Sequence, residues 1–243
     1  KKNMSLFQFV LILVLSNFLV NFILLFLSVN KKSPKPFLRF FFLPILLIAW
    51  LALAVQQIND LAYISTRQVL GNLLLSLWVL KSFYLNKTLK LALLSDFLNK
   101  FKNAIVKKEL KRIIWMIFYV SLLQIICFSP VVSLNFLSGP SSFYWMDFIS
   151  LTICVFGISI YLKSINQQKS LEILPLKGLL EHSIHPEYFG NLLFFLGLFL
   201  LSVGATGGIW SLVGPLTILL LMHKVIIPEN ERRALSKVTI HNQ

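Results

Sequence analysis

The residues best placed to do chemistry lie in the last third of the chain, in the stretch KGLLEHSIHPEYFGN that begins at Lys177. Two carboxylates and two imidazoles stand there, just before an apolar run: Glu181, His182, His185 and Glu187. Pro186 suits the first position of a helix, because proline has no N–H and the first N–H groups of a helix lack partners. Free N–H groups beside imidazoles form a site that can hold an anionic group.

The predicted helix also presents polar groups on one face. Tyr188 and Asn191 are three residues apart and therefore project from the same side of a helix. Gly190 and Gly197 permit close contact with a neighbouring helix. A helix cap flanked by two surface histidines explains the same residues, and local chemistry leaves both interpretations open.

Other common catalytic patterns are missing from the sequence. It contains no HExxH, paired cysteines or clustered carboxylates, so no metal site is predicted. It also contains no GxSxG, P-loop or GxGxxG motif. The two cysteines, Cys127 and Cys154, lie inside apolar stretches and indicate no disulfide framework.

The elements that must position these residues are membrane helices. Of the 243 residues, 57% are hydrophobic and 13% are charged, against about 25% charged in soluble domains. At about 20 apolar residues for each span, the composition predicts an all-α polytopic protein with seven transmembrane helices. The predicted spans are 6–29, 37–55, 69–85, 113–134 and 143–162, followed by a helical hairpin over 188–227 that is broken at 204–208. The first run is too long for a signal peptide, and no small-x-small cleavage site follows it.

Basic residues orient these spans. They cluster after the first, third, fifth and seventh predicted spans, whereas the other connections carry almost no charge. Lys and Arg concentrate on the cytoplasmic side, so the amino terminus is expected outside and the carboxyl terminus in the cytosol. The net charge of +14 is thereby explained by orientation and attraction to anionic membrane lipid, and no nucleic-acid partner is predicted. The connection 86–112 predicts an amphipathic helix on the cytoplasmic surface.

No repeat or linker divides the chain, so a single domain over 1–243 is expected. Bacterial inner membrane and endoplasmic reticulum both suit this composition, and the sequence indicates no oligomeric state.

The motif that begins at Lys177 resembles the G-L-x-x-x-S-R-H-P-N-Y-F-G-E motif of the steroid 5-alpha-reductase-like membrane proteins, including their bacterial branch of unknown substrate. The resemblance covers roughly 65–233, with further similar stretches at 65–68, 123–135, 157–168 and 214–231. It implies a seven-span fold with a cytosolic carboxyl terminus, and it places the cofactor motif region at about 157–233.

The resemblance also implies an activity, namely reduction of an activated carbon–carbon double bond by NADPH. The substrate would be a lipophilic small molecule, steroid-like or isoprenoid-like, that enters from the bilayer. Transfer of the motif predicts four cofactor-binding residues: His185, Tyr188, Asn191 and Glu231. The resemblance assigns no catalytic acid, and Gln57 and Tyr84 are candidates for polarising the substrate.

Three motif positions differ from the family pattern. The family's Arg is Ile184 here, its Asn is Glu187, and its Glu is Asn191. Replacing Arg by Ile removes a guanidinium fork suited to phosphate. Two alternatives to a reductase therefore stay open. One is a non-catalytic membrane protein that retains the fold. The other is an S-adenosylmethionine-dependent carboxyl methyltransferase of the isoprenylcysteine type, whose R-H-P-x-Y-x-G motif is related.

Overall fold

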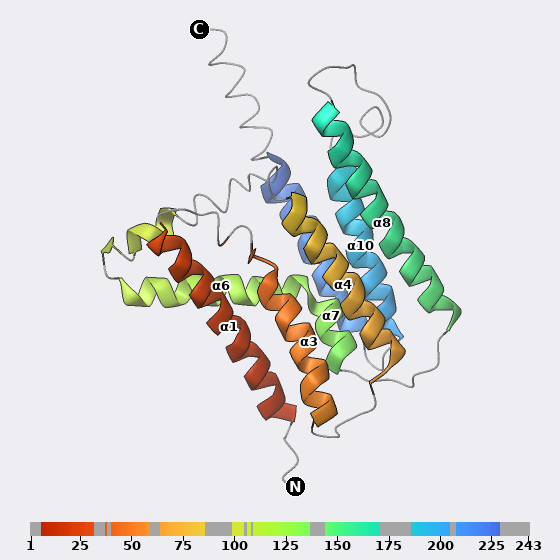
Figure 1. Ribbon diagram of the computed structural model, residues 1–243, viewed down its shortest axis with the longest axis horizontal. Coiled ribbons are helices and arrows are strands. Elements are labelled where there is room, and N and C mark those ends of the chain that lie inside the picture. The colour runs from red at the N-terminus through yellow and green to blue at the C-terminus, as the bar shows by residue number, and fades with distance from the viewer. Residues whose placement is uncertain are drawn as a thin grey trace. The chain divides into compact units, whose positions relative to one another are not determined.

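A computed structural model provides the fold of the chain (Figure 1). It describes residues 6–31, 37, 40–58, 64–85, 99–104, 106–107, 109–136, 144–170, 186–204 and 208–228. Within these ranges all regular structure is helical and no strand occurs. The predicted all-α class is therefore confirmed for the described part of the chain.

The helices follow the apolar runs of the sequence. Their bounds are α1 (Leu6–Asn30), α3 (Leu43–Ile58), α4 (Thr66–Leu85), α6 (Leu110–Cys127), α7 (Ser129–Phe136), α8 (Trp145–Ser170), α10 (Pro186–Val203) and α11 (Val213–Leu221). A 3₁₀ helix, η1 (Gly208–Leu212), precedes α11, and a π-helical turn, η2 (Met222–Ile226), follows it. The predicted break of the last hairpin is confirmed, because α10 ends at Val203 and the next helix begins at Gly208.

Five of the described helical segments are long and apolar enough to cross a membrane: Leu11–Ser28, Leu110–Cys127, Trp145–Gln167, Pro186–Val203 and Gly208–Ile226. Their length and composition support a membrane protein. The other two predicted spans fall on α3, whose apolar part Leu43–Val55 is shorter, and on α4. The count of seven spans and their orientation stay predictions.

The predicted fourth span, 113–134, is divided into two helices. α6 ends at Cys127, Phe128 forms a turn, and α7 begins at Ser129. Pro130 accounts for the division, because a proline inside a helix removes one hydrogen bond and its ring clashes with the preceding turn. The Phe128 carbonyl accepts hydrogen bonds from the N–H groups of Val131 (2.9 Å) and Val132 (3.1 Å) and so restarts the helix.

The predicted amphipathic helix of 86–112 is described only from residue 99 onward. Residues 99–104 are helical, and a turn at Lys107 separates them from α6. Leu110, which lies within this connection, begins α6 and is 69% exposed.

The chain forms two compact units, neither of them continuous in sequence. Unit 1 comprises 1–61, 75–126 and 220–243, and unit 2 comprises 62–74 and 127–219. The expectation of a single domain over 1–243 stays a prediction.

Unit 1 is held together by polar side chains within an apolar core. α1 lies beside α3 (Figure 1), and Asn21 of α1 donates a hydrogen bond to Gln124 of α6 (Nδ2–Oε1 2.7 Å). Gln124 in turn donates to the Phe41 carbonyl (2.7 Å), while Asn17 donates to the Ser121 carbonyl (3.2 Å). Such bonds between membrane helices each contribute about 0.6–2 kcal/mol and fix how the helices align.

In unit 2, α8 and α10 run antiparallel with their backbones in contact. A Cβ atom added at Gly157 would lie 2.7 Å from the Gly190 carbonyl oxygen and from the Phe194 nitrogen. A Cβ added at Gly190 would lie 2.7 Å from the Gly157 carbonyl oxygen, and one at Gly197 would lie 2.8 Å from the Ser150 carbonyl oxygen. The predicted close contact at Gly190 and Gly197 is confirmed. It is the small-residue packing by which membrane helices associate.

We expect Gly157→Ala to destabilise the protein by about 1–3 kcal/mol, because the new methyl group meets backbone atoms that have no free space to move into. The midpoint of unfolding in an SDS titration, followed by circular dichroism, measures this change. Ser159→Ala on the same helix is the control, because Ser159 is exposed and bonds only the Val155 carbonyl of its own helix. Equal midpoints for the two variants would contradict the proposed backbone contact.

Candidate functional site

Two of the four predicted cofactor-binding residues, Tyr188 and Asn191, lie at one end of the α8–α10 pair. Tyr188 and Asn191 lie in the first two turns of α10, and both are half-buried. Pro186 is the first residue of α10, as predicted. His185 and Glu231 lie outside the described residues, as do Ile184 and the side chains of the substrate candidates Gln57 and Tyr84.

Residues near the carboxyl end of α8 complete this cluster. The Ser164 hydroxyl donates a hydrogen bond to the Glu187 carboxylate (Oγ–Oε2 3.2 Å). Tyr161 is 2% exposed and packs against the first turns of α10, because a Cβ at Gly190 would lie 2.8 Å from the Tyr161 nitrogen. We call Tyr161, Ser164, Glu187, Tyr188 and Asn191 the α10-start cluster.

Sequence reasoning missed Tyr161 and Ser164 as members of this cluster. Both lie on an apolar helix, three residues apart, and therefore on one face of α8. That spacing was a usable signal. Which helix this face meets depends on the glycine contacts with α10, and those contacts are not visible in either helix alone.

The chemistry of the α10-start cluster favours neutral polar groups over phosphate. Its hydroxyl and amide groups can donate and accept hydrogen bonds. The Glu187 carboxylate already occupies the first turn of α10, where a negative charge is stabilised by the helix dipole. A phosphate at the same helix end would meet this like charge. The predicted anion site is therefore weakened by the residue that replaces the family's Asn.

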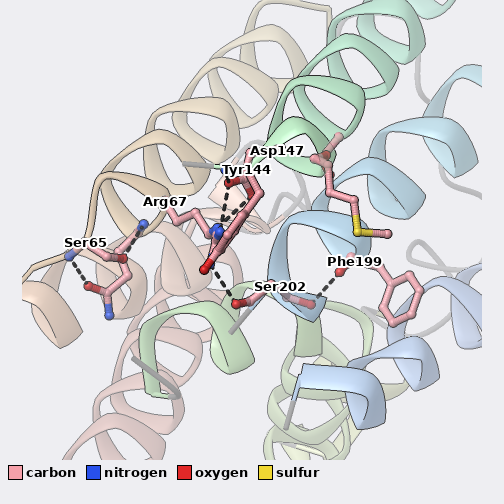
Figure 2. Close-up of polar contacts among 10 residues, drawn as sticks. Ser65, Arg67, Tyr144, Asp147, Phe199 and Ser202 are labelled. Atoms are coloured by element: carbon pink, nitrogen blue, oxygen red, sulfur yellow. Dashed lines mark hydrogen bonds and ion pairs between the residues drawn. The ribbon is translucent and has the colours of Figure 1, made fainter. Parts of the chain in front are cut away.

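A second polar cluster lies at the opposite end of α8 and α10 (Figure 2). The Arg67 guanidinium pairs with the Asp147 carboxylate through two hydrogen bonds (Nε–Oδ1 2.7 Å, Nη2–Oδ2 2.9 Å). Its remaining nitrogen, Nη1, donates to the Gly204 carbonyl (2.7 Å). The two side chains are only 6% and 2% exposed. The Tyr144 ring covers the guanidinium, with the Arg67 Cζ 5.3 Å from the ring centroid.

This ion pair joins three elements of unit 2. Arg67 belongs to the first turn of α4, Asp147 to the first turn of α8, and Gly204 follows the end of α10. Asp147 also accepts a hydrogen bond from the backbone N–H of Tyr144 (2.8 Å), which caps the start of α8. These bonds fasten the starts of α4 and α8 to the end of α10, a structural role that we call the pinning role of the pair.

The start of α4 is held by its own capping residues and by amides of α7. The Ser65 hydroxyl accepts from the Gln68 N–H (3.3 Å), and the Gln68 side chain accepts from the Ser65 N–H (2.9 Å), as in a capping box. Gln68 donates onward to the Asn135 carbonyl (3.2 Å). Asn72 and Asn135 exchange a pair of amide hydrogen bonds (3.2 and 3.0 Å).

Serine hydroxyls connect the far end of α10 to η1 and α7. The Ser202 and Ser211 hydroxyl oxygens are 2.7 Å apart, and Ser202 also donates to the Phe199 carbonyl (2.7 Å; Figure 2). Ser129 of α7 donates to the Ser211 carbonyl (2.9 Å). Together with Arg67–Asp147, these bonds give unit 2 a continuous polar layer at this end.

The sequence alone does not predict that Arg67 pairs with Asp147. A usable signal existed, because both residues border predicted spans on the side that the charge pattern places outside. An isolated acid and an isolated base at the same membrane depth are candidates for pairing.

Comparison with known protein families shows which family the chain belongs to. A family model described as "Protein of unknown function (DUF1295)" matches residues 39–242. The chain belongs to the DUF1295 family. The matched range contains Arg67, Asp147 and the whole α10-start cluster, whereas α1 precedes it. No curated protein matches this DUF1295 chain. No solved structure matches it either.

Removing one partner of the buried ion pair should destabilise the protein strongly. We expect Arg67→Met or Asp147→Leu alone to cost about 3–5 kcal/mol, because each leaves an unpaired buried charge. The double variant should cost clearly less than the sum of the single variants. Reversible SDS unfolding of all four proteins measures this coupling.

The exposed pair Glu109–Arg112 provides the matched control. Its nitrogen–oxygen distance is 3.0 Å, but its side chains are 52% (Arg112) and 36% (Glu109) exposed. Removing either partner of an exposed pair changes stability by about 0–1 kcal/mol. If the Arg67 and Asp147 variants behaved like this control, or if their effects simply added, the pinning role would be wrong.

Proposed function

We propose that this DUF1295 protein is a membrane-embedded, NADPH-dependent reductase of an activated carbon–carbon double bond in a lipophilic, steroid-like or isoprenoid-like substrate. The observation that carries the proposal is the position of the steroid 5-alpha-reductase-like motif. α10 begins at Pro186 of that motif, Tyr188 and Asn191 lie in its first two turns, and Ser164 of α8 donates a hydrogen bond to Glu187 in the first turn. A polar cluster next to two tightly packed apolar helices suits a site where a polar cofactor meets a lipophilic substrate.

The described residues fit part of such a cofactor. Tyr188, Asn191 and Ser164 would bind ribose hydroxyls and the nicotinamide carboxamide, since these groups both donate and accept hydrogen bonds. Glu187 would accept from a ribose hydroxyl but would repel a phosphate. Bound NADPH would supply hydride to the activated carbon. His182 and His185, which precede α10 in the motif, would then bind the phosphates.

Access for the substrate would be from the bilayer. Phe189, adjacent to Tyr188 in the motif, is 53% exposed, and Leu162 of α8 is 40% exposed. Exposed apolar groups beside the α10-start cluster suit the approach of a lipophilic molecule from the bilayer.

One observation favours a second candidate, a non-catalytic membrane protein that retains the fold. The Glu187 carboxylate accepts a hydrogen bond from Ser164 (3.2 Å) at the helix end where a phosphate would bind. The motif also has Ile184 in place of the family's Arg. Both changes remove favourable charge from a phosphate site.

We further propose that the chain is an integral membrane protein of the bacterial inner membrane or the endoplasmic reticulum, with seven spans and a cytosolic carboxyl terminus. The clusters of Lys and Arg after alternate predicted spans support this orientation.

In intact cells, a cysteine at Ser138 should react with an impermeant thiol reagent, whereas one at Asn103 should react only after lysis. The charge pattern puts position 138 in an outer connection and position 103 in a cytosolic one. The unmodified protein is the blank, because Cys127 and Cys154 are both buried. Labelling of position 103 before lysis would overturn the orientation.

Ile184→Arg should tighten NADPH binding if the rest of the pocket is intact. A recovered bidentate bond to phosphate contributes about 1–3 kcal/mol, or roughly five- to a hundredfold in affinity. Glu187→Asn removes the like charge and restores the residue of the steroid 5-alpha-reductase-like motif. The double variant should therefore bind NADPH more tightly than either single variant, measured by fluorescence titration of the purified protein.

Glu109→Gln is the control for this titration, because it removes one negative charge in unit 1 and should leave NADPH affinity unchanged. If the double variant shows no NADPH binding, the reductase proposal fails and the non-catalytic candidate replaces it.

A further inference from the structure

An open groove of about 530 Å³ lies at the start of α6 in unit 1. It is lined by Glu109, Leu110, Lys111, Arg112 and Trp115. Leu110 and Trp115 are 69% and 50% exposed, so apolar and basic side chains are presented together. The surface of the groove is mainly apolar, and the lining residues Glu109, Lys111 and Arg112 bring charged groups next to it.

The groove continues into an exposed aromatic surface on α6. The Trp115 ring contacts the rings of Phe118 and Tyr119, with centroid distances of 5.7 and 6.1 Å. Phe118 is 45% exposed and Tyr119 is 62% exposed. Because Leu110–Cys127 is long and apolar enough to cross a membrane, Lys111 and Arg112 lie at the end of a candidate span. Tryptophan, tyrosine and basic side chains at a span end typically lie at the level of lipid headgroups.

The charges of the groove select the kind of headgroup. Arg112 and Lys111 supply two cations, and Glu109 supplies one carboxylate that pairs with Arg112 (Nη1–Oε2 3.0 Å). This pairing places the guanidinium beside the groove, and the described lining residues together carry one net positive charge. A lipid phosphate that carries one negative charge complements it.

We propose that this groove binds an anionic phospholipid. Its phosphate would contact Lys111 and Arg112, and its acyl chains would lie along Trp115, Phe118 and Tyr119. The site is independent of the proposed reductase activity, since it uses other residues in the other compact unit. Binding there would hold the cytosolic end of α6 next to one class of lipid. This selective binding would add to the general electrostatic attraction between basic residues and anionic lipid.

Brominated lipids test this site, because bromine quenches tryptophan fluorescence on contact. The protein is reconstituted into phosphatidylcholine vesicles that contain a minor fraction of phosphatidylglycerol, with only the latter brominated. The fluorescence of the wild-type protein minus that of Trp115→Phe gives the fluorescence of Trp115 alone. We expect Trp115 to be quenched well beyond the level set by the bulk fraction of phosphatidylglycerol.

Charge variants then test the headgroup contacts. Each cation should contribute about fivefold in affinity, the equivalent of about 1 kcal/mol. Lys111→Gln combined with Arg112→Gln should bring quenching down to the bulk level. Lys163→Gln, which removes an exposed lysine from α8, should have no effect. Glu109→Gln should leave quenching equal or raise it, because it removes a negative charge from the groove.

Two results would overturn the proposal. One is quenching of wild-type Trp115 at the bulk level. The other is loss of enrichment in Glu109→Gln together with enrichment of brominated phosphatidylethanolamine. That outcome would mean that the carboxylate binds an ammonium group and that the groove selects an aminophospholipid.

Discussion

The direct backbone contact between α8 and α10 is the interaction on which the rest of unit 2 depends. Gly157 and Gly190 lie opposite one another, and neither position has room for a Cβ atom. Lipid is as apolar as the side chains themselves, so burial of apolar surface contributes little free energy to helix association in a membrane. Close van der Waals packing must therefore contribute much of the free energy that holds α8 and α10 together. It also sets the alignment of the two helices, which in turn determines which polar residues meet at their ends.

Each end of this helix pair has a polar cluster of a different kind. At one end, Arg67 and Asp147 form a buried ion pair through two hydrogen bonds, and Arg67 donates a third to the Gly204 carbonyl. All three nitrogen–oxygen distances are shorter than 3 Å. At the other end, the Ser164 hydroxyl donates a longer hydrogen bond of 3.2 Å to the Glu187 carboxylate. The first cluster is almost fully buried. The second cluster combines buried Tyr161 and Ser164 with half-buried Glu187, Tyr188 and Asn191, and such partial exposure suits a ligand site.

Glu187 is the residue on which the functional argument depends. A carboxylate in the first turn of a helix is favourable for folding, because it interacts with the positive end of the helix dipole. The same charge opposes a phosphate at that helix end. A carboxylate at this position therefore favours the stability of α10 and would oppose the proposed anionic cofactor, whereas the steroid 5-alpha-reductase-like motif has a neutral Asn there.

The sequence alone determined the all-α class, the approximate bounds of most helices and the break before Gly208, because apolar runs and glycine clusters act locally. It also determined the start of α10, through Pro186. Only the tertiary structure decided that Arg67 pairs with Asp147, 80 residues further along, and that Tyr161 and Ser164 face the first turns of α10. These pairings follow from helix alignment. That alignment is set by packing of glycine faces on separate helices, which no local pattern in one helix specifies.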